Sequence, residues 1–294
     1  CDKLVKELSY KIKYYYQMNS KDLTVIVTTL KSESKIYSCI NSIPENIRVL
    51  VIENSENRKF KEELESKYSN VECYLTGKNK GYSVANNLGL SKVITKYALV
   101  LNPDTTILNH TLNKFFETAK LIPEFWLIGP KQIYSKGHKL FKSNLIEVDN
   151  LKGFAIFFNM KKFSNNFFDE NFFLYFEEID LCKKVKKQNG KIYLDENINI
   201  SHDGGSSVDK IFQIELEKNR NWHWMWSTFY FHKKYKGFIF ALIKIFPKLI
   251  SSFFKTIFYM IIFNNKYRDI YFCRLSGIFN SILGRKSWYR PSLD

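Results

Sequence analysis

Paired cysteines are missing from this sequence. Its five cysteines are scattered, and no two of them form a C-x-x-C pair. Disulfide-rich secreted domains and structural zinc sites both need cysteines paired at short, regular spacings. We therefore expect neither a disulfide framework nor a zinc site, and we expect a reducing, cytoplasmic compartment.

The glycine-rich loops that hold phosphates in two large classes of nucleotide-binding protein are also missing. Neither G-x-G-x-x-G nor G-x-x-x-x-G-K-[ST] follows the first apolar run, at 23–30. The sequence therefore does not support a dinucleotide-dependent oxidoreductase or a P-loop NTPase. A nucleotide bound to this chain would instead be held by side chains and a metal.

The start of the sequence has no long apolar run. Residues 1–17 alternate charged and aromatic residues and lack the apolar centre of a secretory signal peptide. We expect residues 1–22 to form an N-terminal extension. No internal repeat and no low-complexity linker divides the rest of the chain.

Acidic residues are scarce near the end of the sequence. Residues 210–294 hold 15 Lys/Arg and 4 Asp/Glu, so +11 of the formal net charge of +16 lies in this segment. The segment is also apolar and aromatic, which favours an anionic membrane surface rather than nucleic acid as its partner. We expect 208–294 to form a helical, membrane-associating region.

The first two thirds of the chain alternate between two apolar patterns. Continuous β-branched or apolar runs predict buried strands, and apolar residues at helical spacing predict helices. Strands are expected at 23–30, 47–54, 71–76 and 97–102, with helices at 35–43, 57–67 and 81–93 between them. This order predicts an α/β fold with a mainly parallel sheet flanked by helices, over residues 23–207.

The rest of this domain is less regular. Residues 111–175 are rich in phenylalanine and contain a weak strand pattern at 153–160. A helix is expected at 177–188, closed by Asn189-Gly190, then a strand from 191 and a loop at 201–207.

The run 238–263 is long enough to span a bilayer but is interrupted by Lys244, Pro247, Lys248 and Lys255. Each lysine at mid-membrane would cost roughly 2.5–3.5 kcal/mol on insertion scales. Two amphipathic helices in the membrane interface, broken near Pro247, fit this pattern better. A helical hairpin buried within a soluble protein is the alternative.

Polar residues follow the expected strands, where ligands of parallel sheets bind. Asn102-Pro103-Asp104 comes directly after one strand, and Thr28, Glu53 and Asn54 end two others. Carboxylate and amide oxygens suit Mg²⁺ or Mn²⁺, whose coordination a diphosphate can complete. Asn, Pro and Asp are also ordinary turn formers, so a plain turn is an equal reading of this tripeptide.

Two further segments carry polar residues in unusual settings. "NKGYSVANNLG" at 79–89 is too rich in amides and glycine for a routine helix start, and a helix N-terminus suits ligand oxygens. "FFDENFFLYFEEID" at 167–180 places carboxylates beside aromatic rings, which can raise a carboxyl pKa to suit a general base. An ordinary loop and an ordinary acidic first turn are the alternatives. For His202, a metal ligand, a hydrogen-bonding loop residue and a residue without a special role all stay open, and a lone histidine is usually the last of these.

Together these pieces resemble family 2 glycosyltransferases, the inverting GT-A type, and within them the rhamnosyltransferase-like branch. They occur in family order and at family spacing over about residues 23–207, and a fainter likeness continues through 219–237. The matching pieces are "LTVIVTTL", "VIENSEN", "NKGYSVANNLG", "LNPDTTI", "FFDENFFLYFEEIDLCKKVKKQNGKI" and "HDGGSS".

The resemblance implies a role for each matching residue. Thr28, Glu53 and Asn54 line the nucleoside pocket, and Asn79, Gly81, Tyr82 and Asn87 border the nucleotide. Asp104 and Asn102 match the metal motif, with Asn102 in place of a carboxylate, and His202 can complete the coordination of Mg²⁺ or Mn²⁺. Glu178 is the expected catalytic base with Glu177 as the fallback. Gly153, Phe154 and Asp180 are assigned to the acceptor side.

The resemblance also implies an activity. We expect transfer of a sugar, rhamnose in the branch resembled, from a nucleotide diphosphate donor to a saccharide acceptor that is lipid-linked. The expected setting is the inner face of a bacterial membrane, in cell-surface polysaccharide synthesis. The alternative is a non-catalytic, membrane-associated scaffold with the same fold. A nucleotidyltransferase is disfavoured because "TTLKSESK" lacks a glycine-rich basic loop.

Overall fold

The computed structural model describes residues 21–108, 110–131, 139–142, 144–165, 167–202 and 213–290. Residues 1–20 of the expected N-terminal extension and 203–207 of the expected loop lie outside this part. Within it the chain forms two compact units. The first comprises 21–78, 85–167 and 181–202, and the second comprises 79–84, 168–180 and 213–290.

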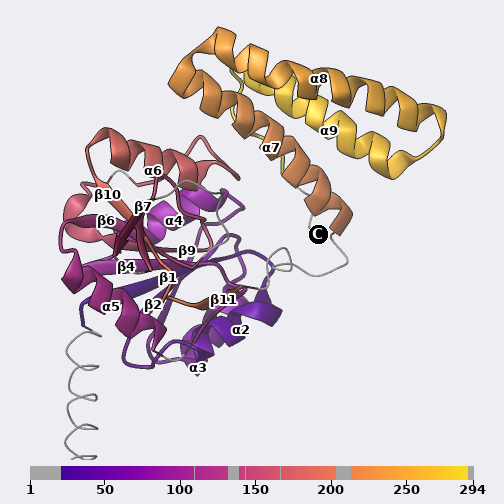
Figure 1. The fold of residues 1–294 in the computed structure, drawn as a ribbon. Helices are drawn as coiled ribbons and strands as arrows, with labels where there is room; N and C mark the ends of the chain where they lie inside the picture. Colours follow the sequence, from indigo (N-terminus) through magenta and orange to yellow (C-terminus); the bar gives the residue numbers. More distant parts are fainter. Residues whose placement is uncertain are drawn as a thin grey trace, which may run out of the picture. The chain divides into compact units, whose positions relative to one another are not determined.

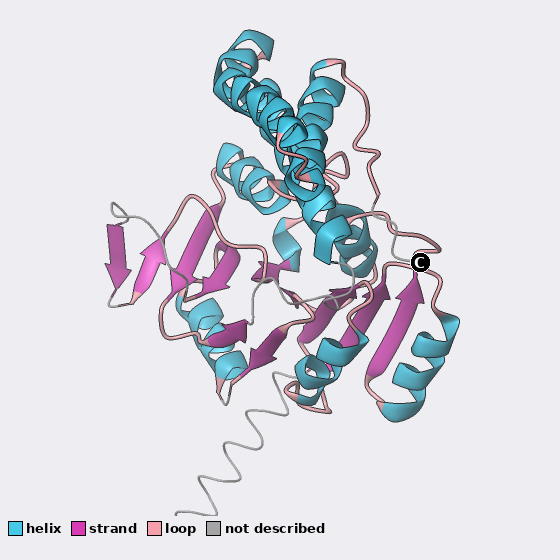
Figure 2. Ribbon diagram, turned by 90° about the vertical axis from the view of Figure 1, so that its right-hand side faces the viewer, coloured by secondary structure: helices cyan, strands magenta, loops and turns pink. Residues whose placement is uncertain are grey.

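The first unit is built on a mixed sheet of nine described strands, drawn in Figures 1 and 2. Their order in the sheet is β3-β2-β1-β4-β9-β6-β10-β8-β7. The strands are β1 (Leu23–Thr29), β2 (Arg48–Glu53), β3 (Val71–Leu75), β4 (Tyr97–Leu101), β6 (Phe125–Pro130), β7 (Lys139–Lys142), β8 (Leu145–Glu147), β9 (Ala155–Asn159) and β10 (Lys191–Asp195).

Parallel pairing dominates the half of this sheet that the sequence predicts. β1 pairs in parallel with β2 and β4, and β2 with β3. β9 is fully buried and runs antiparallel between β4 and β6, so the weak strand pattern at 153–160 marks a central strand. The expected α/β fold is confirmed, and its antiparallel strands come from the phenylalanine-rich segment.

Helices cover both faces of this sheet. They are α2 (Glu33–Asn41), α3 (Arg58–Lys67), α4 (Tyr82–Ser91), α5 (Thr111–Leu121) and α6 (Glu177–Lys187). Alternate strand residues, such as Val25 and Val27, share one core cluster with α2, α3 and α5. On the opposite face Gly89 of α4 lies so close that a Cβ there would be 2.6 Å from Ile26 Cγ2.

A small second sheet pairs β5 (Thr105–Ile107) with β11 (Ile200–His202), antiparallel, with His202 opposite Thr105. The expectation of a loop from residue 201 is therefore wrong for 201 and 202. Backbone pairing to β5 holds these two residues in a strand, although the sequence around them reads as polar and turn-forming.

The second unit contains three long helices that pack against one another: α7 (Gln213–Lys236), α8 (Phe238–Ile261) and α9 (Asn265–Ile282). Their shared core includes Met225 and Phe229 of α7, Ile245 of α8 and Ile278 of α9. Hydrogen bonds join the same helices, for example from Trp222 Nε1 to Ser276 Oγ at 3.1 Å.

The expected break near Pro247 is wrong, because α8 is continuous through this residue. A proline removes one backbone hydrogen bond from a helix. Here Ala241 and Ile245 before the proline and Leu249 after it pack into one cluster with α7 and α9, and this packing keeps the helix whole. None of the helices in the described part of the chain is long and apolar enough to cross a bilayer.

Gly277 should be essential to the packing of α9 against α7. A Cβ at this position would lie 2.3 Å from the carbonyl oxygen of Trp222, and a backbone atom cannot rotate away. We expect Gly277→Ala to destabilise the second unit by about 2–3 kcal/mol. Urea unfolding followed by tryptophan fluorescence measures this, because Trp222, Trp224, Trp226 and Trp288 all belong to that unit.

Ser251→Ala, at an exposed position of α8, is the matched control and should leave the unfolding midpoint unchanged. A Gly277→Ala midpoint equal to that of the control would contradict the close contact.

Candidate functional site

The carboxyl ends of three neighbouring strands converge at one edge of the first unit's sheet. Thr29 lies opposite Glu53, and Val27 lies opposite Leu101, so β1, β2 and β4 end together. Thr28 Oγ1 donates a hydrogen bond to Asn86 Oδ1 at 3.0 Å. The backbone N–H of Asn54 donates to the carbonyl of Thr29 at 2.8 Å. The structure thus brings Thr28, Glu53 and Asn54 to the same edge, as the sequence predicts.

Glu53 is a buried carboxyl at this edge, with only 1% of its surface exposed. The Ser55 hydroxyl donates to Oε1, while Oε2 has no hydrogen-bond partner in the part of the chain that is described. Burial raises the Glu53 pKa from 4.5 to about 7, and the Ser55 hydrogen bond opposes this rise. The side chain therefore changes charge near neutral pH.

The Asn102-Pro103-Asp104 turn is fixed through its backbone. The N–H of Asn102 donates to the carbonyl of Phe154 at 2.9 Å. The carbonyl of Asn102 accepts from the N–H and the hydroxyl of Thr105, at 3.2 and 2.7 Å. These bonds hold Asp104 directly before β5, with 6% of its surface exposed.

His202 lies beside Asp104 because β11 pairs with β5. Its Nε2 is 3.4 Å from Asp104 Oδ1. The imidazole ring stacks on Phe154 at 4.8 Å, with an angle of 9° between the ring planes. Two residues far apart in the sequence thus place an oxygen and a nitrogen atom, both able to coordinate a metal ion, close together.

This pair can serve as part of a divalent cation site. The described residues contain no group of three or more His, Cys, Asp or Glu side chains placed to hold a metal. Mg²⁺ and Mn²⁺ are commonly bound by one or two protein ligands, with waters and substrate phosphates completing the coordination. Asp104 and His202 therefore fit a cation that shares its ligands with a bound diphosphate.

In the second unit, the loop before α4 packs against the phenylalanine-rich segment 168–176. Gly81 has a φ of 87°, and a Cβ there would lie 2.5 Å from Phe173 Cδ2, so only glycine fits. Asn79 Oδ1 accepts from the Gly81 N–H at 3.1 Å, and the Tyr82 N–H donates to the Phe173 carbonyl at 2.9 Å. Arg290, which the sequence did not single out, lies 3.7 Å from the Phe173 ring centre and donates to the Asn79 carbonyl.

The residues just before α6 adopt a rare backbone conformation. Tyr175 and Phe176 have φ values of 71° and 73°, a left-handed region that bulky residues seldom enter. The Trp224 ring packs against both, at 5.1 and 5.5 Å between ring centres. Ser227 Oγ donates to the Leu174 carbonyl at 2.9 Å. Contacts with α7 therefore hold the turn that leads into the acidic helix start.

Glu177 and Glu178 form the first turn of α6. Burial raises the pKa of both carboxyls, and the charge of Glu178 raises that of Glu177 further. Glu177 is 6% exposed, whereas Glu178 is half-buried. The raised pKa agrees with the expectation for carboxylates beside aromatic rings, and Glu178 is the more accessible of the two.

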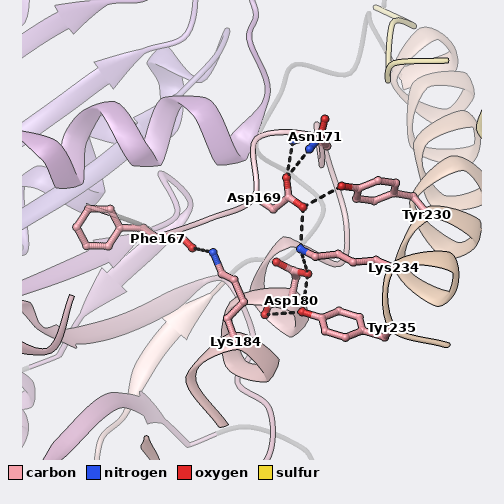
Figure 3. A network of polar contacts seen from close by, with 8 residues as sticks. All are labelled: Phe167, Asp169, Asn171, Asp180, Lys184, Tyr230, Lys234 and Tyr235. Atoms are coloured by element: carbon pink, nitrogen blue, oxygen red, sulfur yellow. Dashed lines mark hydrogen bonds and ion pairs between the residues drawn. The ribbon is translucent and has the colours of Figure 1, made fainter. Parts of the chain in front are cut away.

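Asp180 is the buried member of an ionic network of the second unit (Figure 3). Its Oδ1 accepts from Lys234 Nζ at 2.6 Å and from the Tyr235 hydroxyl at 2.8 Å. Lys234 also donates to Asp169, which accepts from the Tyr230 hydroxyl as well. In this structure the Asp180 carboxylate therefore faces α7, and its expected role on the acceptor side stays a prediction. Gly153, Phe154 and Asn87 lie half-buried in the first unit.

Comparison with known proteins identifies the family of the chain. Residues 24–181 match the model of glycosyl transferase family 2, which is more than half of the chain. The chain belongs to this family. The match includes the strand tips, the Asn102-Pro103-Asp104 turn and the start of α6.

Relatives of this family 2 glycosyl transferase are distant. It is 25% identical over 195 residues to the low-salt glycan biosynthesis hexosyltransferase Agl10 of Haloferax volcanii, covering 57% of this chain and 62% of that protein. The chain thus spans less than two thirds of that relative's length.

Two solved structures share the fold. Staphylococcus aureus TarS is 16% identical with a TM-score of 0.50, over 68% of this chain and 39% of that one. GalNAc-T7, crystallised with UDP, GalNAc and Mn²⁺, is 11% identical with a TM-score of 0.53, over 63% and 43%. At these identities the likeness shows the fold, and the expected GT-A-like architecture is confirmed.

The Glu53 pKa predicts how stability depends on pH. Because the folded-state pKa is about 7 and the ordinary value is 4.5, the folded chain keeps a proton that the unfolded chain loses between these values. The contribution of Glu53 to stability is therefore present below pH 4.5 and is lost as pH rises toward 7. Glu53→Gln, which stays neutral, should gain up to roughly 3 kcal/mol relative to the wild type between pH 5 and 8.

Urea unfolding of both proteins at pH 5 and pH 8 measures this difference. Glu45→Gln, at an exposed position, is the control and should show no such pH-dependent gain. Equal stability differences for Glu53→Gln at the two pH values would show that Glu53 does not titrate in this range.

Proposed function

We propose that this family 2 glycosyl transferase moves a hexose from a nucleotide diphosphate donor to a saccharide acceptor, with inversion at the anomeric carbon. The observation that carries the proposal is the Asp104–His202 pair. It lies beside a backbone-fixed turn in the unit that also holds the polar ends of β1 and β2. An oxygen and a nitrogen ligand beside the ends of parallel strands suit a cation that is bound to the diphosphate of a nucleotide sugar.

The donor would be held mainly by residues of the strand ends. We propose that Thr28, Glu53 and Asn54 contact the nucleoside, and that Asn79, Gly81, Tyr82 and Asn87 border the nucleotide. Asp104, His202 and Asn102 would hold Mg²⁺ or Mn²⁺. Such an ion, when bound, stabilises the negative charge that develops on the leaving diphosphate.

Glu178 is proposed as the general base. A carboxylate with a raised pKa accepts a proton more readily, which suits removal of the proton from an acceptor hydroxyl. The oxygen then attacks the anomeric carbon from the face opposite the leaving group, and this single displacement inverts the configuration. The greater accessibility of Glu178 supports choosing it over Glu177, which is almost fully buried.

The substrates are proposed from chemistry and resemblance. The Haloferax relative is by name a hexosyltransferase of glycan biosynthesis, and rhamnose, a deoxyhexose, falls within that class. We propose a rhamnosyl donor, as in the branch that the motifs resemble, and a lipid-linked saccharide as acceptor, in cell-surface polysaccharide synthesis.

We further propose that the second unit docks on the inner face of a bacterial cell membrane. α8 exposes a row of large apolar side chains, including Ile239, Ile243, Phe246, Phe254 and Ile261. Exposed apolar surface of this extent on one helix is typical of an interfacial helix, and the positive charge of the segment attracts anionic lipids.

Asp104 should matter more for donor binding than Asn102. Asp104→Ala removes the carboxylate of the turn, so we expect metal-dependent donor binding to fall by roughly 10- to 100-fold or more. Asn102→Ala should weaken it less, because the backbone bonds of Asn102 remain. Calorimetry with a panel of nucleotide diphosphate sugars that includes dTDP-rhamnose, with and without Mn²⁺, measures both.

Equal losses in the two variants would make the Asn102 amide a metal ligand of equal weight. No loss in either variant would reject the metal site, and donor binding without turnover by the wild type would favour the scaffold alternative.

Glu178→Gln should keep the fold and the donor affinity but lower kcat by about 10²- to 10⁴-fold, because an amide cannot accept the proton. Glu177→Gln is the matched neighbour and should retain most of the turnover. The measurement is sugar transfer to an acceptor under saturating donor. The reverse pattern would move the base to Glu177, and full activity in both would reject the pair.

A further inference from the structure

Three cations line one flank of α8 and the adjoining side of α9. Lys248 and Lys255 are seven residues apart on α8, so they lie on the same side of the helix. Lys255 Nζ lies 5.0 Å from the Tyr271 ring centre and 3.3 Å from its hydroxyl, and the Arg274 guanidinium lies 5.5 Å from the same ring. We name Lys248, Lys255 and Arg274 the cation seam.

The cation seam has no carboxylate counterpart among the described residues. α8 has no carboxylate, and those of α7 and α9 lie near the starts of these two helices. They form ion pairs with other cations: Glu215 with Lys218, Glu217 with Lys266, and Asp269 with Arg268. No ion pair within the described ranges includes a member of the seam.

Two members of the seam are also partly withdrawn from water. Lys248 is half-buried over the Trp224 ring, and burial lowers its pKa, with repulsion from Arg274 as a second cause. Arg274 Nε is buried and finds no hydrogen-bond acceptor in the described part of the chain. Two neighbouring like charges that lose water and gain no acceptor are destabilising, and a bound anion would reverse this.

The position of the seam identifies the kind of anion. Ala241, Ile245 and Ser252 form the buried side of α8, and the opposite side exposes Ile243, Ile250 and Phe254. Lys248 and Lys255 follow Ala241 at seven-residue intervals, so the seam lies at the edge of the buried side. Lysine and arginine side chains are long enough to reach from there toward phosphates at a membrane boundary. A soluble anion would not need this exposed apolar face beside it.

We propose that the cation seam binds a lipid phosphate that carries more than one negative charge, a phosphomonoester or a diphosphate. Three cations match such a group better than the single charge of a phosphodiester lipid. An arginine and a lysine also supply charge-assisted hydrogen bonds to several of its oxygens. The proposal rests on the proposed membrane docking and gives it a specific headgroup.

Vesicle co-sedimentation of the full chain tests the seam. Phosphatidylcholine vesicles would contain either phosphatidic acid, a phosphomonoester, or phosphatidylglycerol, a phosphodiester, at contents adjusted to equal surface potential. We expect the wild type to bind the phosphatidic acid vesicles about tenfold more tightly, as one or more additional charged hydrogen bonds would give. In Lys248→Gln/Arg274→Gln this ratio should fall to about one.

Lys244→Gln/Arg285→Gln is the matched control, because it removes the same two charges at exposed positions of α8 and just after α9. It should weaken binding to both vesicles and keep the ratio. A ratio near one in the wild type, or an unchanged ratio in Lys248→Gln/Arg274→Gln, would overturn the seam. If inorganic diphosphate, at a concentration equal to that of the phosphatidic acid, displaces the protein from these vesicles, the seam binds a soluble anion and the lipid assignment is wrong.

A second variant separates the seam from the docking itself. Ile243→Ser/Phe254→Ser removes two exposed apolar side chains and should lower binding to every vesicle. The ratio of its affinity for phosphatidic acid vesicles to that for phosphatidylglycerol vesicles should stay as in the wild type. If this variant binds all vesicles as the wild type does, the docking proposal fails on its own, whatever the seam variants show.

Discussion

The register between β1 and its two parallel neighbours determines where the polar strand ends of the first unit lie. Because Thr29 is opposite Glu53 and Val27 is opposite Leu101, the three strands end at one edge. A shift of one residue would turn the alternate buried side chains of β1 to the other face, and the core on both faces forbids this. The same register fixes the turn after β4, which leads into β5, and β5 in turn holds β11. The packing that fixes the register of β1 therefore also brings Asp104 and His202 together, through β4, β5 and β11.

Burial acts on the carboxyl groups of this protein in two ways, and the presence of a cation decides which. Glu53 and Glu177 are buried and form no ion pair with a lysine or arginine among the described residues, and their pKa values rise. Asp180 is at least as deeply buried, yet it contacts Lys234 and Tyr235, which supply the charge and the hydrogen bond that a carboxylate needs. A paired carboxylate of this kind holds the start of α6 against α7 within the second unit. The carboxyl of Glu53, which has no such pair and a pKa of about 7, gains or loses its proton near neutral pH.

The strands of the first unit were predictable where local sequence decides them. β-branched runs such as 23–29 have few alternatives to a buried strand, and the structure has β1 there. The continuity of α8 through Pro247 was not predictable, because packing with α7 and α9 outweighs a local helix breaker. β11 was missed because its pairing to β5 is a long-range contact. The proximity of His202 to Asp104 followed from the family resemblance, since nothing local to either residue reports the other.

The left-handed turn at Tyr175 and Phe176 shows why the start of α6 is a special place. Such a conformation costs about 1–3 kcal/mol for each bulky residue, and sequence alone would assign it to glycine or asparagine. Trp224 and Ser227 of α7 hold the turn against this cost. The helix dipole favours ionised acids in a first turn by only about 0.3–1 kcal/mol, so it opposes desolvation weakly, and the pKa of both glutamates still rises. A segment that bears backbone strain and carboxyl desolvation together is held for the position of its side chains, which is what a general base requires.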